Sequence, residues 1–127
     1  MTTVVDASAY LDLLLDVVPA RDRRHFDADL AVPEIFHVEL ASGLARCERR
    51  GLVDGARVSA MLAETLSAPL DVVSSVMLVE RAFELRHNVS LYDGCYVALA
   101  EQLACGILTA DARLARAPGI DVPFTLV

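Results

Sequence analysis

Residues 90–111, SLYDGCYVALAEQLACGILTAD, contain the pattern that decides the fold. The spacing of their apolar residues predicts a helix over 90–104, and Gly106 is typical of a residue that ends a helix. The apolar run over 107–109 predicts a short strand that leads directly to Asp111. A helix followed at once by a short apolar strand is typical of an α/β unit, in which the strand joins a parallel sheet.

The remainder of the chain continues this alternation. We expect further strands over residues 2–5, 30–32, 70–73 and 122–127. We expect further helices over residues 8–15, 20–26, 33–50, 54–67, 75–87 and 112–116. Pro33 suits the first turn of its helix, and Val76, Val79 and Phe83 share one face of the 75–87 helix. Short apolar strands separated by helices imply a parallel sheet with helices on both faces, and the length of 127 residues predicts one domain over 1–127.

The composition limits the classes of function. Hydrophobic residues make up 55% of the chain, which excludes a disordered protein and predicts an apolar face that is buried against a partner. The 18 acidic and 11 basic residues give a net charge of −7, and every basic residue is arginine. This charge argues against coating nucleic acid by bulk electrostatics. Any role on nucleic acid would depend on individual arginines or on bound cations.

The sequence also predicts a cytoplasmic location. No stretch approaches the roughly 18 uncharged residues of a membrane-spanning helix. The first residues have no basic leader and carry Asp6, Asp12 and Asp16, so we do not expect a signal peptide. The chain has three cysteines and no Cys-x-x-Cys pair, which favours reduced thiols over a disulfide framework.

Two acidic residues lie at the ends of predicted strands. Asp6 closes the first strand and Asp111 follows the strand over 107–109. Ligands of a doubly wound sheet bind outside the carboxyl ends of its strands, so these two side chains could share a crevice. The alternative is that each aspartate caps the following helix, a common position for this residue type.

Two more acidic residues lie on helical faces that are otherwise apolar. Asp93 falls within the apolar stripe of its helix, where a charge needs a partner. Its alternative explanation is a capping box, because residues 90–93 match Ser-x-x-Asp. Glu39 lies in the middle of the predicted 33–50 helix and has no basic residue three or four positions away. Gly43, one turn further on, is expected to leave open space beside it.

Together these four carboxylates suggest one acidic pocket, which would repel itself without a ligand. Oxygen donors without a histidine or cysteine suit a hard cation, Mg²⁺ or Mn²⁺. Arg46 lies on the same helical stripe as Glu39 and could guide a phosphate toward that cation. The alternative for Arg46, within a cluster that also holds Arg49 and Arg50, is a solvated surface.

Three segments carry a resemblance to a known family: VVDASA (4–9), PEIFHVELASGLAR (33–46) and LYDGCYVALAEQLACGILTADARL (91–114). In this order they resemble the PIN-domain ribonucleases, and most of all the VapC-type toxins of bacterial toxin–antitoxin pairs. The acidic quartet of that family falls on Asp6, Glu39, Asp93 and Asp111. Ser8 matches its hydroxyl residue near the first aspartate, and Thr109 its polar residue before the fourth.

The resemblance implies a three-layer α/β/α sandwich with a central parallel sheet of four or five strands. It implies a Mg²⁺-dependent endoribonuclease, with Mn²⁺ as a substitute, that cleaves tRNA or another structured RNA. It also implies a cognate antitoxin that blocks the site, and a homodimer. Asp6 and Asp93 would hold the principal ion, and Glu39 and Asp111 would complete its shell or hold a second one.

Two other functions stay open on the sequence. The first is a catalytically silent PIN-like module that only binds proteins. The second is a receiver-type phosphotransfer domain. That class needs paired acidic residues near the first strand and a late lysine, whereas this chain has only Asp6 there and no lysine.

Overall fold

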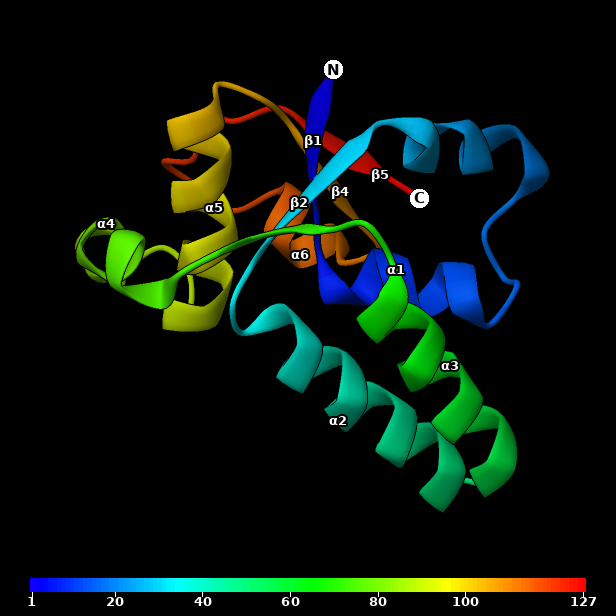
Figure 1. Ribbon diagram of the computed structural model, residues 1–127. Coiled ribbons are helices and arrows are strands. Elements are labelled where there is room, and N and C mark those ends of the chain that lie inside the picture. Colours follow the sequence, from blue (N-terminus) through cyan, green and yellow to red (C-terminus); the bar gives the residue numbers. More distant parts are fainter.

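A five-stranded, wholly parallel sheet organises the protein, as seen in a computed structural model that describes residues 1–127 (Figure 1). The strands are β1 (Thr2–Val5), β2 (Asp29–Pro33), β3 (Asp71–Val73), β4 (Ile107–Thr109) and β5 (Phe124–Leu126). They lie in the order β3-β2-β1-β4-β5, so the chain builds outward from β1 on one side and then returns to its other side at β4. The junction between β1 and β4 is the switch point at which α/β sheets bind ligands.

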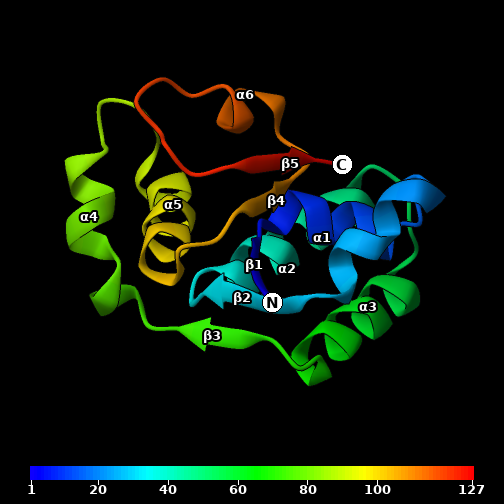
Figure 2. The same cartoon turned by 90° about the horizontal axis from the view of Figure 1, so that it is seen from above.

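Helices cover both faces of this sheet, which confirms the expected three-layer arrangement. The helices are α1 (Ala7–Leu14), α2 (Phe36–Arg49), α3 (Gly55–Ser67), α4 (Val79–Glu84), α5 (Leu91–Leu103) and α6 (Ala112–Ala115). Two 3₁₀ helices, η1 (Ala20–Asp27) and η2 (Ser75–Met77), complete the set. Viewed from above, α4 and α5 lie on one side of the sheet and α1 and α3 on the other (Figure 2). None of these helices has the length and apolar composition needed to cross a bilayer.

The core lies between these layers. Val4 and Val5 of β1 and Val32 of β2 have no exposed surface, and Leu108 of β4 has almost none. These residues belong to a cluster of 25 buried hydrophobic side chains that continues into α5 and α2. Continuous burial of adjacent residues, without alternation, is expected for central strands covered on both faces.

The second long helix begins later than the sequence predicted. Pro33 ends β2, where it pairs with Val73 of β3, and the Glu34 N–H donates to the Val73 carbonyl. The pairing between strands therefore holds these residues extended, and α2 starts only at Phe36. Glu39 consequently lies in the first helical turn and not in the middle of the helix.

The segment predicted as one helix over 75–87 also differs from that prediction in the structure. It is divided into η2 and α4, and the residues that face the core are Leu78 and Ala82, each without exposed surface. The face that carries Val76, Val79 and Phe83 is exposed instead. Ala82 packs tightly on α5, because a Cβ atom added at Gly94 would lie 3.0 Å from the Ala82 Cα.

Candidate metal centre

One cavity at the carboxyl ends of β1 and β4 collects the predicted acidic residues. It has a volume of about 560 Å³. Side chains from the end of β1, from α2, from α5 and from the end of β4 line it, and they include Asp6, Glu39, Asp93 and Asp111. The sheet topology brings the first and last of these together, because β1 and β4 are adjacent parallel strands.

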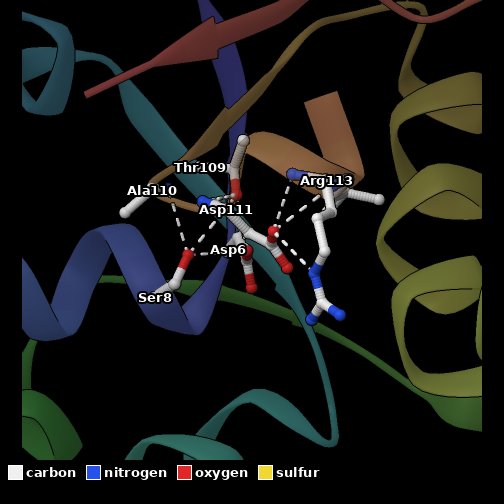
Figure 3. A network of polar contacts seen from close by, with 7 residues as sticks. Asp6, Ser8, Thr109, Ala110, Asp111 and Arg113 are labelled. Atoms are coloured by element: carbon white, nitrogen blue, oxygen red, sulfur yellow. Dashed lines mark hydrogen bonds and ion pairs between the residues drawn. The ribbon is translucent and has the colours of Figure 1, made fainter. Parts of the chain in front are cut away.

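Asp6 is the most buried of the four, with 7% of its surface exposed. Its Oδ2 atom accepts hydrogen bonds from Ser8 Oγ at 2.8 Å and from Thr109 Oγ1 at 2.7 Å (Figure 3). Although Asp6 precedes α1, its side chain does not cap that helix. The capping alternative is therefore wrong for Asp6, whose carboxylate is held by two hydroxyl groups.

The same two hydroxyls also accept hydrogen bonds from the loop after β4. Ser8 Oγ accepts from the Ala110 N–H at 3.0 Å, and Thr109 Oγ1 accepts from the Asp111 N–H at 3.0 Å. Each hydroxyl thus donates to Asp6 and accepts from the backbone that leads to the fourth acidic residue (Figure 3). This network fixes the position of Asp6 relative to the Asp111 backbone.

Asp111 does have the capping role that was the alternative for it. Its Oδ1 atom accepts from the N–H groups of Arg113 and Leu114, at 2.9 and 3.4 Å, at the start of α6. The Arg113 Nε atom lies 3.8 Å from the same oxygen, but that guanidinium is exposed and contributes little. The cap occupies Oδ1 and leaves the other carboxylate oxygen for a further contact.

Glu39 is held from the opposite layer. Its Oε1 atom accepts a hydrogen bond of 2.7 Å from the hydroxyl of Tyr96, a residue of α5 with no exposed surface. Burial, Asp6 and Asp93 raise the pKa of Glu39, while the Tyr96 hydrogen bond lowers it. Gly43 lines the cavity together with Glu39, as expected, and a Cβ added there would lie 2.9 Å from Cδ2 of Leu11 in α1.

Asp93 lies in the first turn of α5. The Ser90 hydroxyl caps this helix by accepting from the Asp93 N–H at 3.1 Å, so the capping motif is formed through the backbone of Asp93. Burial is the main cause that raises the pKa of the Asp93 carboxyl, and Asp6 and Asp111 raise it further. The structure therefore brings the carboxylates close enough to repel one another.

The cationic part of the cavity comes from α2. Arg46 and Arg50 both line it, whereas Arg49 between them does not. Arg46 was predicted from its helical stripe, whereas Arg50 was assigned to a solvated cluster. The contact of Tyr96 with Glu39 was not predicted, because an aromatic residue within an apolar stripe indicates only a packed core.

The donor set fits a hard divalent cation. Four carboxylates provide the oxygen ligands that Mg²⁺ prefers, and a cation would relieve the repulsion that, after burial, raises the pKa values of Glu39 and Asp93. No group of three or more acidic, histidine or cysteine side chains already has the arrangement of a metal site. Instead, one oxygen of Glu39 accepts a hydrogen bond from the Tyr96 hydroxyl, and one oxygen of Asp111 accepts from the backbone amides at the start of α6.

Comparison with known proteins gives the same picture of the fold. Residues 3–120 match the family model described as PIN domain. The chain is 41% identical over 127 residues to the VapC ribonuclease Mb0985 of Mycobacterium bovis, which covers 98% of this chain and 97% of that protein. Among solved structures, PAE2754 from Pyrobaculum aerophilum superposes with a TM-score of 0.72 at 26% identity, over 98% of this chain and 83% of that one.

A chain of a toxin–antitoxin complex from Klebsiella pneumoniae has a TM-score of 0.61 at 18% identity, over 98% of this chain and 99% of that one, and is alike in fold. The family match spans nearly the whole sequence, from β1 to the loop before β5. This chain belongs to the PIN domain family.

Proposed function

We propose that the protein is a Mg²⁺-dependent endoribonuclease and the toxin of a toxin–antitoxin pair. The observation that carries this proposal is the single cavity in which carboxylates from four separate parts of the chain converge. A relative at 41% identity is named a VapC ribonuclease, which supports RNA as the substrate. The resemblance to the VapC-type toxins favours tRNA or another structured RNA.

We assign the principal cation to Asp6 and Asp93, with Mn²⁺ as a possible substitute for Mg²⁺. Glu39 and Asp111 would complete the shell, partly through water, or would hold a second ion. When bound, the cation supplies charge stabilisation on the phosphoryl oxygens and lowers the pKa of water. Ser8 and Thr109 keep Asp6 oriented, since both donate to the oxygen that faces them.

Arg46 is proposed to hold a phosphate of the RNA beside the carboxylates. It lines the same cavity as the acidic residues and forms no ion pair with an acidic residue. An arginine without such a partner in a chain of net charge −7 is free to bind a substrate phosphate. This local placement agrees with a protein that does not attract RNA through its overall charge.

We propose two protein partners, a cognate antitoxin and a second copy of this chain. A structural relative was solved as a toxin–antitoxin complex, which supports the first. Exposed apolar side chains on η2 and α4, at Val76, Met77, Val79 and Phe83, support an apolar contact surface. We assign this surface, the η2–α4 patch, to the second copy.

The decisive experiment maps RNA 5′ ends in cells after brief expression of the wild-type chain and of Asp6→Ala. New 5′-phosphate ends at defined positions, absent with Asp6→Ala, are the expected result. Purified protein should degrade the mapped RNA in the presence of Mg²⁺, and the addition of EDTA should stop this degradation. If the purified protein leaves that RNA intact in Mg²⁺ and no new ends appear in cells, the silent interaction module is the better explanation.

A further inference from the structure

Tyr96 is a polar residue in a position that packing alone does not explain. Its ring has no exposed surface, and it lies in α5 among buried apolar neighbours. A buried hydroxyl needs a partner. The Tyr96 hydroxyl crosses to another layer and donates to Oε1 of Glu39 at 2.7 Å.

The position of Tyr96 links two of the segments that line the cavity. It follows Asp93 by three residues on α5, so the two side chains lie on the same face of that helix. Its hydroxyl thus reaches the α2 carboxylate from the helix that carries Asp93.

We propose that Tyr96 is a positioning residue of the cation site, whose hydroxyl fixes the Glu39 carboxylate so that its second oxygen faces the cavity. This inference rests on the proposed function, because it concerns the ion held there. A hydrogen bond to one carboxylate oxygen restricts the rotation of the group and leaves the other oxygen for an ion or its water.

The test uses Mn²⁺ alone as the probe and measures its affinity for the purified full chain by calorimetry. Tyr96→Phe removes only the hydroxyl oxygen, and we expect the Mn²⁺ affinity to fall about tenfold or more, as for other residues that orient a metal ligand. Thermal unfolding without metal reports whether the variant is folded. Tyr10→Phe is the matched control, because Tyr10 is a buried tyrosine that packs on Phe36 and does not line the cavity.

A double-mutant cycle with Glu39→Gln separates positioning from a general effect on the fold. If Tyr96 acts through Glu39, Tyr96→Phe lowers the Mn²⁺ affinity of the wild type but not that of Glu39→Gln. An equal loss in both backgrounds, or no loss in the wild-type background, overturns the proposal for Tyr96. A wild-type chain that binds no Mn²⁺ and cleaves no RNA overturns the proposed function together with this inference, so the two failures are distinguishable.

Discussion

Ser8 and Thr109 are 101 positions apart in the sequence, yet their hydroxyl oxygens lie 3.4 Å from each other. They meet because both donate to Oδ2 of Asp6 and both accept from the backbone after β4. The two hydroxyls therefore join the first and the fourth strand at the point where the carboxylates converge.

Thr109→Val should destabilise the protein by about 1–3 kcal/mol, because the change leaves the Asp111 N–H without its acceptor and Asp6 with one donor fewer. Equilibrium unfolding in urea measures this loss. Thr125→Val is the matched control in the neighbouring strand β5, where no side-chain hydrogen bond is made, and it should change stability by less than about 0.5 kcal/mol. Equal stabilities of the two variants would contradict a structural role for the network.

Asp93→Asn should abolish cleavage and leave the metal-free protein as stable as the wild type or more so. The substitution removes a negative charge that burial, Asp6 and Asp111 disfavour, and it keeps the backbone N–H that Ser90 caps. Ser90→Ala makes the opposite change, since it removes the cap but keeps the carboxylate, and should cost about 1 kcal/mol. Urea unfolding in EDTA gives the stabilities, and a clear destabilisation by Asp93→Asn would contradict repulsion between Asp93 and the neighbouring carboxylates.

The stability of the metal-free protein should rise as the pH falls. The pKa values of Glu39 and Asp93 in the folded chain lie above their ordinary values of 4.5 and 3.8. Between the ordinary and the raised values, the folded state binds more protons than the unfolded state, so the free energy of unfolding increases with falling pH. Unfolding in EDTA at a series of pH values measures this slope.

Saturating Mg²⁺ should weaken or reverse that slope, because a bound cation compensates the same charges. Asp93→Asn in EDTA should show a smaller slope than the wild type, since it lacks one of the carboxyl groups whose pKa is raised. If the slopes with and without Mg²⁺ coincide, the cation does not bind at these carboxylates.

Arg46→Gln and Arg50→Gln should each weaken RNA binding, and Arg49→Gln should not. All three arginines lie at the end of α2, but only the first two line the cavity. Binding is measured in the Asp93→Asn background, so that RNA remains intact, at several salt concentrations. Loss of one phosphate contact lowers the slope of log affinity against log salt by about 1. Identical behaviour of the three variants would indicate that the cluster is only a solvated surface.

Phe83→Ser should convert the proposed homodimer into a monomer. Phe83 lies in the η2–α4 patch with 56% of its surface exposed, so the polar substitution leaves the core intact. Leu66→Ser is the control, because Leu66 is similarly exposed on α3, outside the patch. Light scattering after size exclusion measures the mass, and a dimer that persists with serine at position 83 would assign the contact to another surface.

Much of the fold and site was predictable because the signals are local. The short apolar strands and intervening helices indicate a parallel sheet, and Asp6 and Asp111 lie within two residues of the ends of their strands. Their meeting then depends only on β1 and β4 being neighbours. Asp93 was predictable because a charge in an apolar helical stripe conflicts with the rest of its face.

The remaining features depend on contacts between distant segments. The start of α2 is set by the pairing of Pro33 with Val73, forty positions away, which no helical pattern contains. The buried face of α4 is set by the close approach of Ala82 to Gly94. The role of Tyr96 depends on a carboxylate 57 positions away, and hydrophobic periodicity does not report hydroxyl partners.

The central position of β1 has a consequence for synthesis of the protein. Its neighbour β4 begins only at Ile107. The first strand to be synthesised therefore pairs on that side with a strand that is synthesised near the end of the chain. Hydrogen bonds to Asp6 from Thr109 cannot form before that residue has emerged. Translation that stops before Thr109 therefore yields fragments in which Asp6 lacks this hydrogen bond and the acidic cluster is not assembled.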